Sequence, residues 1–288
     1  MTELKVEVEP GAVGFDAARL ARIDSHFARY VDDGRLPGWL ILVSRGGKIA
    51  YLGKRGYRDL ESGAPVEWDT LFRIYSMTKP VTAVAAMMLY EEGAFELKDP
   101  VSRFIPAFKG TRVYHGGSAL KPVTEPLREP IRIWHLLTHT AGLTYGFHHA
   151  HPVDALYRAA GFEWGPPDGM DLAACCEVWA RLPLLFQPGA EWNYSVASDV
   201  LGRVIEVVSG QSLDRFFVER IFQPLDMRDT RFWVNEEDAG RLAAFYAPHP
   251  ETLRAARNDA MDRVARQRPA CCLGGDGLVS TAADYHRF

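Results

Sequence analysis

Residues 71–92, LFRIYSMTKPVTAVAAMMLYEE, contain a serine, a lysine three positions later and a long apolar run. The pattern predicts a helix that is apolar almost all round, and such a helix belongs at the centre of a domain. Ser76 and Lys79 fall in its first turn, where positions i and i+3 share a face, so the hydroxyl and the amine can meet. A serine hydroxyl becomes an effective nucleophile when a neighbour takes its proton, and a lysine can be that neighbour.

Two interpretations of this pair stay open when it is taken alone. In the first, Ser76 is a nucleophile beside its base, and the positive end of the helix stabilises an oxyanion. In the second, Ser76 caps the helix and Lys79 is a solvated side chain. Ser-x-x-Lys is a short pattern, so the decision between the two depends on the rest of the chain.

The composition is ordinary for a globular protein: 288 residues, of which 47% are hydrophobic and 24% are charged. The formal net charge of −4 gives no reason to expect a nucleic-acid partner. No apolar run is long enough for a membrane span, and the first residues lack the apolar core of a secretory signal. We therefore expect a cytoplasmic protein with neither a nucleic-acid nor a membrane partner.

The cysteines form two adjacent pairs, at 175–176 and 271–272. Neither pair has the spacing of a zinc site, and adjacent cysteines rarely bridge each other, so we expect free thiols in a reducing compartment. The histidines within 148–151 have no carboxylate or cysteine pattern beside them, which favours a solvated loop over a metal site. We expect neither a cofactor nor a metal ion.

Caps, turns and apolar spacing predict regular elements along much of the chain. Helices are expected over 15–33, 171–182, 197–209 and 212–222, with a further helix starting at 281, and a hairpin over 39–56. Residues 106–130 are rich in proline and glycine, and 144–170 in glycine, histidine, proline and aromatics. We predict that both segments are irregular and that the hairpin is the one evident in the chain.

Four motifs occur in an order that resembles the serine β-lactamase-like family. They are Tyr75-Ser76-Met77-Thr78-Lys79-Pro80, residues 135–143 (HLLTHTAGL), Pro188-Gly189 ahead of Tyr194-Ser195-Val196, and residues 277–284 (GLVSTAAD). This family includes class C β-lactamases, D-alanyl-D-alanine peptidases and family VIII esterases, and the likeness is strongest to the esterases. It runs from about residue 15 to the end of the sequence, and it favours the nucleophile interpretation of Ser76.

The resemblance implies an α+β fold in which an antiparallel sheet is flanked by helices and an all-helical region is inserted between its strands. Residues 1–70 would form the N-terminal part of the α/β domain and 71–235 a mainly helical region carrying the Ser-x-x-Lys and tyrosine motifs. Residues 236–288 would return towards the α/β domain. The family's third motif, Lys-Thr-Gly or its equivalent, does not occur, so we expect the C-terminal strands to be missing.

The resemblance also implies the site. Ser76 would be the acylated nucleophile, Lys79 and Tyr194 would share proton transfer, and the backbone N–H of Ser76 would be one oxyanion donor. From the residues alone, Tyr194 also fits a half-buried structural tyrosine. His139 lies in a family motif, and we expect it to be structural, with its ring tied to neighbouring backbone.

Departures from the family pattern bear on the substrate. β-Lactamases have Tyr-x-Asn where this chain has Val196, which cannot hydrogen-bond an acylamido group, and this favours a carboxylic ester. Asp276 stands among glycines, where it would strain a turn or lie on the surface. Trp164 and Trp192 are candidates for an acyl pocket.

We therefore predict a serine hydrolase that cleaves small-molecule carboxylic esters through an acyl-Ser76 intermediate. Two alternatives stay open. One is a β-lactam-hydrolysing or penicillin-binding protein. The other is a non-catalytic, truncated homologue.

Overall fold

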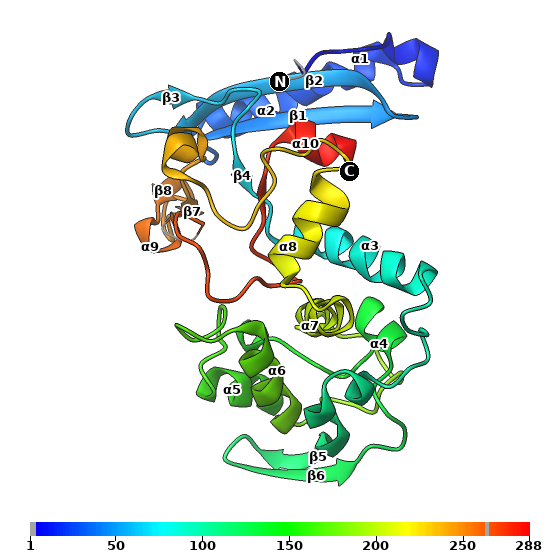
Figure 1. Ribbon diagram of the computed structural model, residues 1–288. Coiled ribbons are helices and arrows are strands. Elements are labelled where there is room, and N and C mark those ends of the chain that lie inside the picture. The colour runs from blue at the N-terminus through cyan, green and yellow to red at the C-terminus, as the bar shows by residue number, and fades with distance from the viewer. Residues whose placement is uncertain (1–3, 263–264) are drawn as a thin grey trace. The chain divides into compact units, whose positions relative to one another are not determined.

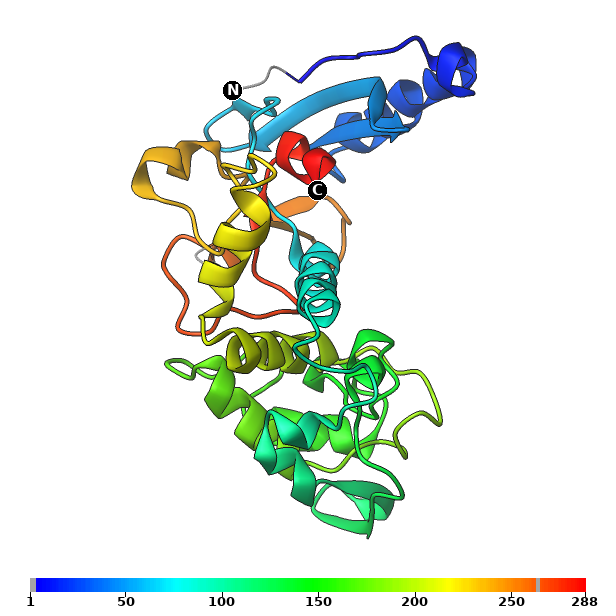
Figure 2. The same cartoon turned by 45° about the vertical axis from the view of Figure 1, so that its right-hand side comes forward.

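The computed structural model describes residues 4–262 and 265–288, which belong to two compact units (Figures 1 and 2). Unit 1 comprises Met1–Arg73, Leu225–Arg268 and Leu278–Phe288, and unit 2 comprises Ile74–Pro224 and Pro269–Gly277. Each unit therefore joins segments that are far apart in the sequence. The mixture of helices with small antiparallel sheets confirms the predicted α+β class.

Unit 1 is built on a three-stranded antiparallel sheet with the strand order β1-β2-β3. Its elements are α1 (Ala17–Leu20), α2 (Arg22–Asp32), β1 (Gly38–Arg45), β2 (Lys48–Asp59), β3 (Ala64–Pro65), β4 (Phe72–Arg73), β7 (Tyr246–Pro248), β8 (Ala255–Arg257), α9 (Asp259–Asp262), β9 (Val279–Ser280) and α10 (Ala282–Arg287). The predicted hairpin is confirmed as β1–β2, with Gly46 and Gly47 at positive φ in its turn. Helix α2 covers this hairpin, and the ring of Phe27 lies 6.1 Å from that of Trp39.

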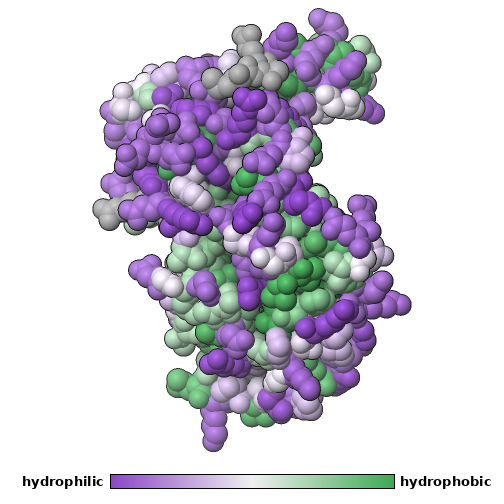
Figure 3. All heavy atoms as spheres, viewed as in Figure 1, coloured by the Kyte–Doolittle hydropathy of each residue, from purple (hydrophilic) through white to green (hydrophobic). Residues whose placement is uncertain are grey.

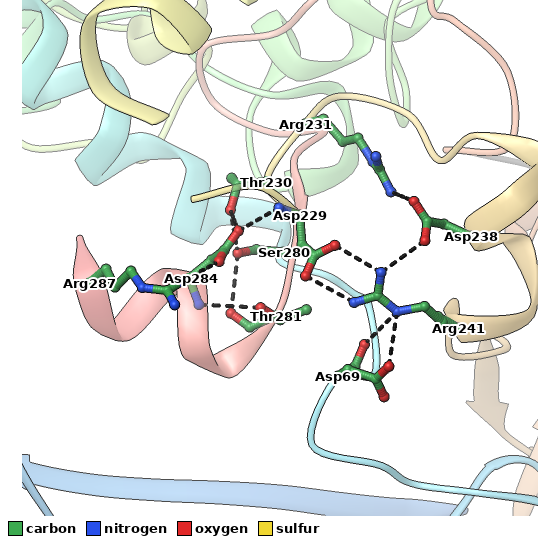
Figure 4. A network of polar contacts seen from close by, with 10 residues as sticks. All are labelled: Asp69, Asp229, Thr230, Arg231, Asp238, Arg241, Ser280, Thr281, Asp284 and Arg287. Carbon is green, nitrogen blue, oxygen red and sulfur yellow. Dashed lines mark hydrogen bonds and ion pairs between the residues drawn. The ribbon is translucent and has the colours of Figure 1, made fainter. Parts of the chain in front are cut away.

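A network of charged side chains ties the distant segments of unit 1 together (Figure 4). Arg241 donates two hydrogen bonds to the Asp229 carboxylate, at 2.8 and 2.9 Å, and one of 2.8 Å to Asp238. Its guanidinium also lies 3.3 Å from the carboxylate of Asp69. Asp284 in α10 accepts the Asp229 N–H at 2.7 Å. These contacts hold α10 and the 229–241 segment to the residues that precede β4.

Unit 2 is mainly helical. Its elements are α3 (Thr78–Glu91), β5 (Arg112–Ser118), β6 (Lys121–Pro126), α4 (Ile133–Leu137), α5 (Pro152–Ala159), α6 (Leu172–Arg181), α7 (Ala197–Ser209) and α8 (Leu213–Phe217). Helices α3 and α7 lie side by side in both views (Figures 1 and 2). Asp171 caps α6 by accepting the Ala174 N–H at 2.7 Å, and Gly210 ends α7 at a φ of 70°. The start of α6 and the end of α7 therefore lie where these caps predict.

Two segments predicted to be irregular contain regular structure, so those predictions are wrong. Residues 106–130 include the antiparallel hairpin β5–β6, in which Pro122 and Pro126 belong to β6. Prolines are tolerated in β6 because it is an edge strand that pairs only with β5 in its sheet, and they hide the strand pattern. Residues 144–170 include α5, which Pro152 opens and whose first turn Asp154 caps by accepting the His151 N–H at 2.9 Å.

The surface of the helical unit is richer in apolar side chains on the face drawn in Figure 3 than that of unit 1, where hydrophilic side chains predominate. None of the helices in the described part of the chain combines the length and the hydrophobicity that a membrane span requires.

Candidate active site

Ser76 lies in a 3₁₀ turn, Tyr75–Met77, that leads directly into α3. Tyr75 has a φ of 45°, a conformation that a bulky residue with a Cβ rarely adopts. Such backbone outliers cluster at functional sites, where the surrounding structure holds them in place. Ser76 itself is exposed, so its hydroxyl is open to a ligand.

The three site residues predicted from the sequence are brought together within unit 2. The Tyr194 hydroxyl donates a hydrogen bond of 2.6 Å to Ser76 Oγ, and Lys79 Nζ lies 3.3 Å from the same oxygen. Lys79 Nζ also lies 4.5 Å from the centre of the Tyr194 ring. A serine hydroxyl with two proton-carrying groups in reach has the arrangement that nucleophilic catalysis requires.

The amino group of Lys79 is fixed by the glycine-rich segment that follows the second cysteine pair. Lys79 Nζ donates a hydrogen bond of 2.7 Å to the Gly275 carbonyl. The Gly275 N–H in turn donates to Asp199 Oδ1, also at 2.7 Å. Asp199 belongs to α7, so a carboxylate on one helix is connected through Gly275 to the lysine on α3.

Glycine is required at both positions of this segment. A Cβ on Gly274 would lie 2.3 Å from the Ser198 carbonyl oxygen. A Cβ on Gly275 would lie 2.9 Å from a carboxylate oxygen of Asp199 and 3.1 Å from the Tyr145 hydroxyl. The glycines therefore let the backbone approach α7 closely enough to hydrogen-bond its carboxylate.

Asp199 is buried, with 3% of its surface exposed. Burial raises the pKa of Asp199 to about 6, against the opposing effect of the nearby Lys79 charge. Tyr145 lies close to this carboxylate, since its hydroxyl and the Asp199 carboxylate both lie within 3.1 Å of the position of a Cβ on Gly275. Burial together with the Asp199 charge raises the pKa of Tyr145 well above its usual value. Asp199 therefore changes its charge near neutral pH, and Tyr145 stays protonated beside it.

Tyr145 also faces the catalytic candidates. Its ring centre lies 5.5 Å from that of Tyr194 and 5.6 Å from Lys79 Nζ. Phe147 stacks on Tyr145 at 4.8 Å, and Trp164 stacks on Phe147 at 5.7 Å. These rings form an aromatic row that begins at the site and ends at Trp164, which is 76% exposed.

His139 also packs against Tyr194, with the ring centres 5.0 Å apart. Its Nδ1 lies 3.3 Å from Ser195 Oγ, so the ring is tied to a side-chain hydroxyl rather than to backbone. Burial, and then the charge of Lys79, lower the pKa of His139 to about 4. The neutral ring at pH 7 supports Tyr194 by packing and carries no charge into the site.

Two further residues that the sequence marked as unusual lie near these groups. Val196 is 4% exposed, so it packs in the core and presents no polar group. Asp276 is half-buried, accepts the Gly277 N–H at 2.6 Å and has no positive φ. Burial raises the pKa of Asp276, while the charge of Lys79 acts in the opposite direction. The expectation of a strained or surface aspartate is therefore wrong.

A cavity of about 630 Å³ opens in unit 1 beside Trp68, Arg228 and Arg287, and none of the site residues described above lines it. The geometry around Ser76, rather than cavity volume, therefore identifies the candidate site. Among residues 4–262 and 265–288, no group of three or more histidine, cysteine, aspartate or glutamate side chains is placed to hold a metal ion.

The sequence reasoning missed Asp199 and the contact that Tyr145 makes with it. The available signal was a charged residue at a position of 197–209 that faces the same way as apolar residues, because an aspartate is rarely buried without a partner. That partner, the N–H of Gly275, is 76 residues away and has no local signature.

Comparisons with known proteins show the family to which the chain is similar. A model of the Beta-lactamase family matches residues 23–288. The chain is 38% identical to Protein Rv1367c of Mycobacterium tuberculosis, over 89% of this chain and 62% of that protein. It is 37% identical to Esterase EstB of Burkholderia gladioli, over 86% of this chain and 60% of that protein.

Among solved structures, EstCE1, described as a hydrolase with promiscuous acyltransferase activity, superposes with a TM-score of 0.77 at 31% identity. The match covers 94% of this chain and 70% of that one. The chain thus spans less than two thirds of the length of the two curated relatives named above.

Proposed function

The chain belongs to the Beta-lactamase family, and from that premise we propose that it is a serine hydrolase that cleaves carboxylic esters by acyl transfer. One observation supports this most strongly: Ser76 Oγ lies 2.6 Å from the Tyr194 hydroxyl and 3.3 Å from Lys79 Nζ. The names of EstB and EstCE1, an esterase and a hydrolase with acyltransferase activity, support the same reaction class.

In the proposed reaction, Ser76 Oγ attacks the ester carbonyl while its proton passes to the Tyr194–Lys79 pair. The backbone N–H of Ser76 would stabilise the oxyanion of the tetrahedral intermediate. The leaving alkoxide takes the proton back from the pair and departs as the alcohol, and the acyl group remains on Ser76. Water then attacks the acyl-enzyme by the same route, releasing the carboxylic acid and restoring the hydroxyl.

Tyr194 and Lys79 would divide the proton transfer according to their positions. Tyr194 is the closer group to Ser76 Oγ, so we propose that it exchanges the proton directly. Lys79 lies over the Tyr194 ring, and its ammonium form would stabilise a phenolate there. The Gly275 carbonyl would keep the amine in that place.

An ester is the proposed substrate because the site lacks the polar group that β-lactamases present at the position of Val196. A buried valine cannot pair with an acylamido group, so a β-lactam would lose that hydrogen bond. Hydrolysis of a β-lactam, or binding of one without turnover, is the second candidate, and the Beta-lactamase family match favours it. Rates with an ester and with a cephalosporin compare the two candidates directly.

Hydrolysis of p-nitrophenyl butyrate by the wild-type chain and by a Ser76→Ala variant tests the proposal. We expect turnover by the wild type and its loss in Ser76→Ala, with circular dichroism showing that both are folded. Ser118→Ala is the matched control, since Ser118 is an exposed serine of the β5–β6 hairpin in the same unit. Equal rates from wild type and Ser76→Ala would overturn the proposal.

The proposal includes a cytoplasmic location and a small-molecule partner. All four cysteines are free, with 175 and 176 buried, which supports a reducing compartment. Fractionation of cells that express the protein tests the location, because recovery outside the cytoplasm would contradict it.

A further inference from the structure

The peptide group that joins Gly274 to Gly275 is held from both sides in unit 2. Its carbonyl oxygen accepts a hydrogen bond of 2.6 Å from the Thr82 hydroxyl on α3. Its N–H donates to Asp199 Oδ1 on α7 at 2.7 Å. One peptide group therefore connects α3, which carries Lys79, to α7, which begins three residues after Tyr194.

The next carbonyl along the chain, that of Gly275, accepts the hydrogen bond from Lys79 Nζ at 2.7 Å. Rotation of the 274–275 peptide would move this carbonyl away from the amine, because the two peptide groups share the Gly275 Cα. The position of Lys79 Nζ beside Ser76 therefore depends on the hydrogen bond between the Gly275 N–H and Asp199.

We propose that Asp199 is a positioning residue of this site, which holds Gly275 so that its carbonyl keeps Lys79 Nζ within reach of Ser76. The inference rests on the proposed acyl-transfer function, and it assigns a role to a residue that touches neither the substrate nor the nucleophile. A carboxylate suits this role because hydrogen bonds to ionised acceptors are shorter and stronger than those between neutral groups.

The role should depend on pH, because the pKa of Asp199, raised by burial to about 6, falls within the working range of an esterase. Protonation of Asp199 would weaken the hydrogen bond that it accepts from the Gly275 N–H. Activity should therefore fall as the pH drops through this value. The titratable groups that face Asp199 or share its charge field are Lys79, Tyr145, Cys176, Cys271 and Asp276. Among them, the charge of Asp276 raises the pKa of Asp199 and that of Lys79 lowers it.

The test measures kcat and KM for p-nitrophenyl butyrate from pH 5 to pH 8.5 in wild type and Asp199→Asn. For the wild type we expect an acid limb in kcat/KM with an apparent pKa near 6, which lowers the rate roughly tenfold between pH 8 and pH 5. The Asn side chain keeps the shape and an acceptor oxygen but does not titrate. Asp199→Asn should therefore lose roughly 10-fold in kcat at pH 8, with little change in KM, and should lack that limb.

Asp154→Asn is the matched control. Asp154 is also buried in unit 2 and also accepts backbone N–H groups, those of Ala150 and His151, both at 2.9 Å. It has no contact with Gly275 or Lys79 among the described hydrogen bonds. We expect the acid limb to stay at the wild-type pH in this variant, whatever its stability.

Asp276→Asn keeps the proposal testable if Asp199→Asn does not fold. Removal of the neighbouring charge should lower the pKa of Asp199, and so move the acid limb by roughly 0.5–1 pH unit to lower pH. An acid limb that is unchanged in both variants would overturn the positioning role, and so would an unchanged kcat in Asp199→Asn.

These outcomes are distinct from failure of the proposed function. If the folded wild type neither hydrolyses the ester nor forms an acyl adduct, the acyl-transfer proposal fails and the role of Asp199 in it fails too. If the wild type turns over and Asp199→Asn matches it at every pH, the acyl-transfer proposal stands and the inference about Asp199 alone is overturned.

Discussion

Each unit contains aspartates that are wholly or partly buried, and their carboxylates have different kinds of partner in the two units. In unit 1, Asp229 and Asp238 pair with the guanidinium of Arg241 (Figure 4). In unit 2, the Asp199 carboxylate accepts the Gly275 N–H, and Lys79 is a nearby charge. The negative charges of the first cluster are neutralised by guanidinium groups, so those carboxylates stay ionised. A buried carboxylate that is hydrogen-bonded mainly to a neutral donor can instead take up a proton.

The pKa values of Asp238 and Asp199 are shifted in opposite directions, in line with this difference. Burial would raise the pKa of Asp238, but hydrogen bonds from Arg231 and Arg241 outweigh it and lower that pKa below the usual value. For Asp199, burial prevails and the pKa rises to about 6. Groups whose pKa is shifted towards neutrality by burial are typical of functional sites, while paired charges of the first kind are typical of structural networks. The comparison therefore favours a structural role for the unit 1 cluster and supports the positioning role proposed for Asp199 in unit 2.

The largest effect is expected from Tyr194→Phe, which removes the hydroxyl hydrogen-bonded to Ser76 and keeps the ring on His139. We expect kcat for p-nitrophenyl butyrate to fall roughly 10²–10⁴-fold, the usual contribution of general acid–base catalysis, with the melting temperature little changed. Tyr285→Phe in unit 1 is the control, and it should keep wild-type kinetics. A wild-type kcat in Tyr194→Phe would show that Tyr194 takes no part in the proton transfer.

The next effect concerns stability as a function of pH. The folded pKa of Asp199 is raised from 3.8 to about 6, so its proton favours folding below pH 4 and this contribution is lost as pH rises through 6. The loss amounts to about 3 kcal/mol. Asp199→Asn should lack it, so urea unfolding should show the wild type losing stability relative to the variant between pH 4 and pH 6.5. A constant difference between them would contradict the raised pKa.

A smaller effect is expected from Arg241→Met in unit 1, whose side chain is 22% exposed. The variant leaves Asp229 and Asp238 without this partner, and we expect the free energy of unfolding to fall by about 1–3 kcal/mol at pH 7. The lowered pKa of Asp238 contributes stability above its unfolded pKa, which is lost as pH falls through the folded value, so the difference from wild type should shrink in acid. Arg215→Met removes an exposed pair with Glu219 and should have no measurable effect.

Local chemistry made a good part of this structure predictable. Asp171 and Gly210 mark helix ends because capping depends on neighbours within one turn, and the β1–β2 turn depends on two adjacent glycines. The Ser76–Lys79 contact also follows from helical spacing. Tyr194 was placed in the site by family resemblance, since its spacing from Ser76, 118 residues, carries no information by itself.

Long-range partners and mixed signals account for what the sequence did not reveal. The β5–β6 hairpin contains prolines that suggest a loop, and α5 begins at a proline within a segment rich in loop-forming residues. Asp199 is a charge on the buried face of an amphipathic helix, and its role depends on Gly275, which contacts it only in the folded chain. Tyr75 adopts a positive φ in a turn that contains no glycine, so the sequence does not predict this conformation.

The most direct measurement of the central claim is the mass of the chain during turnover of p-nitrophenyl butyrate, quenched in acid and followed by peptide mapping. We expect one butyryl group per chain, located on Ser76, and no adduct in the Ser76→Ala variant. An adduct on another residue, or one that persists in Ser76→Ala, would contradict it.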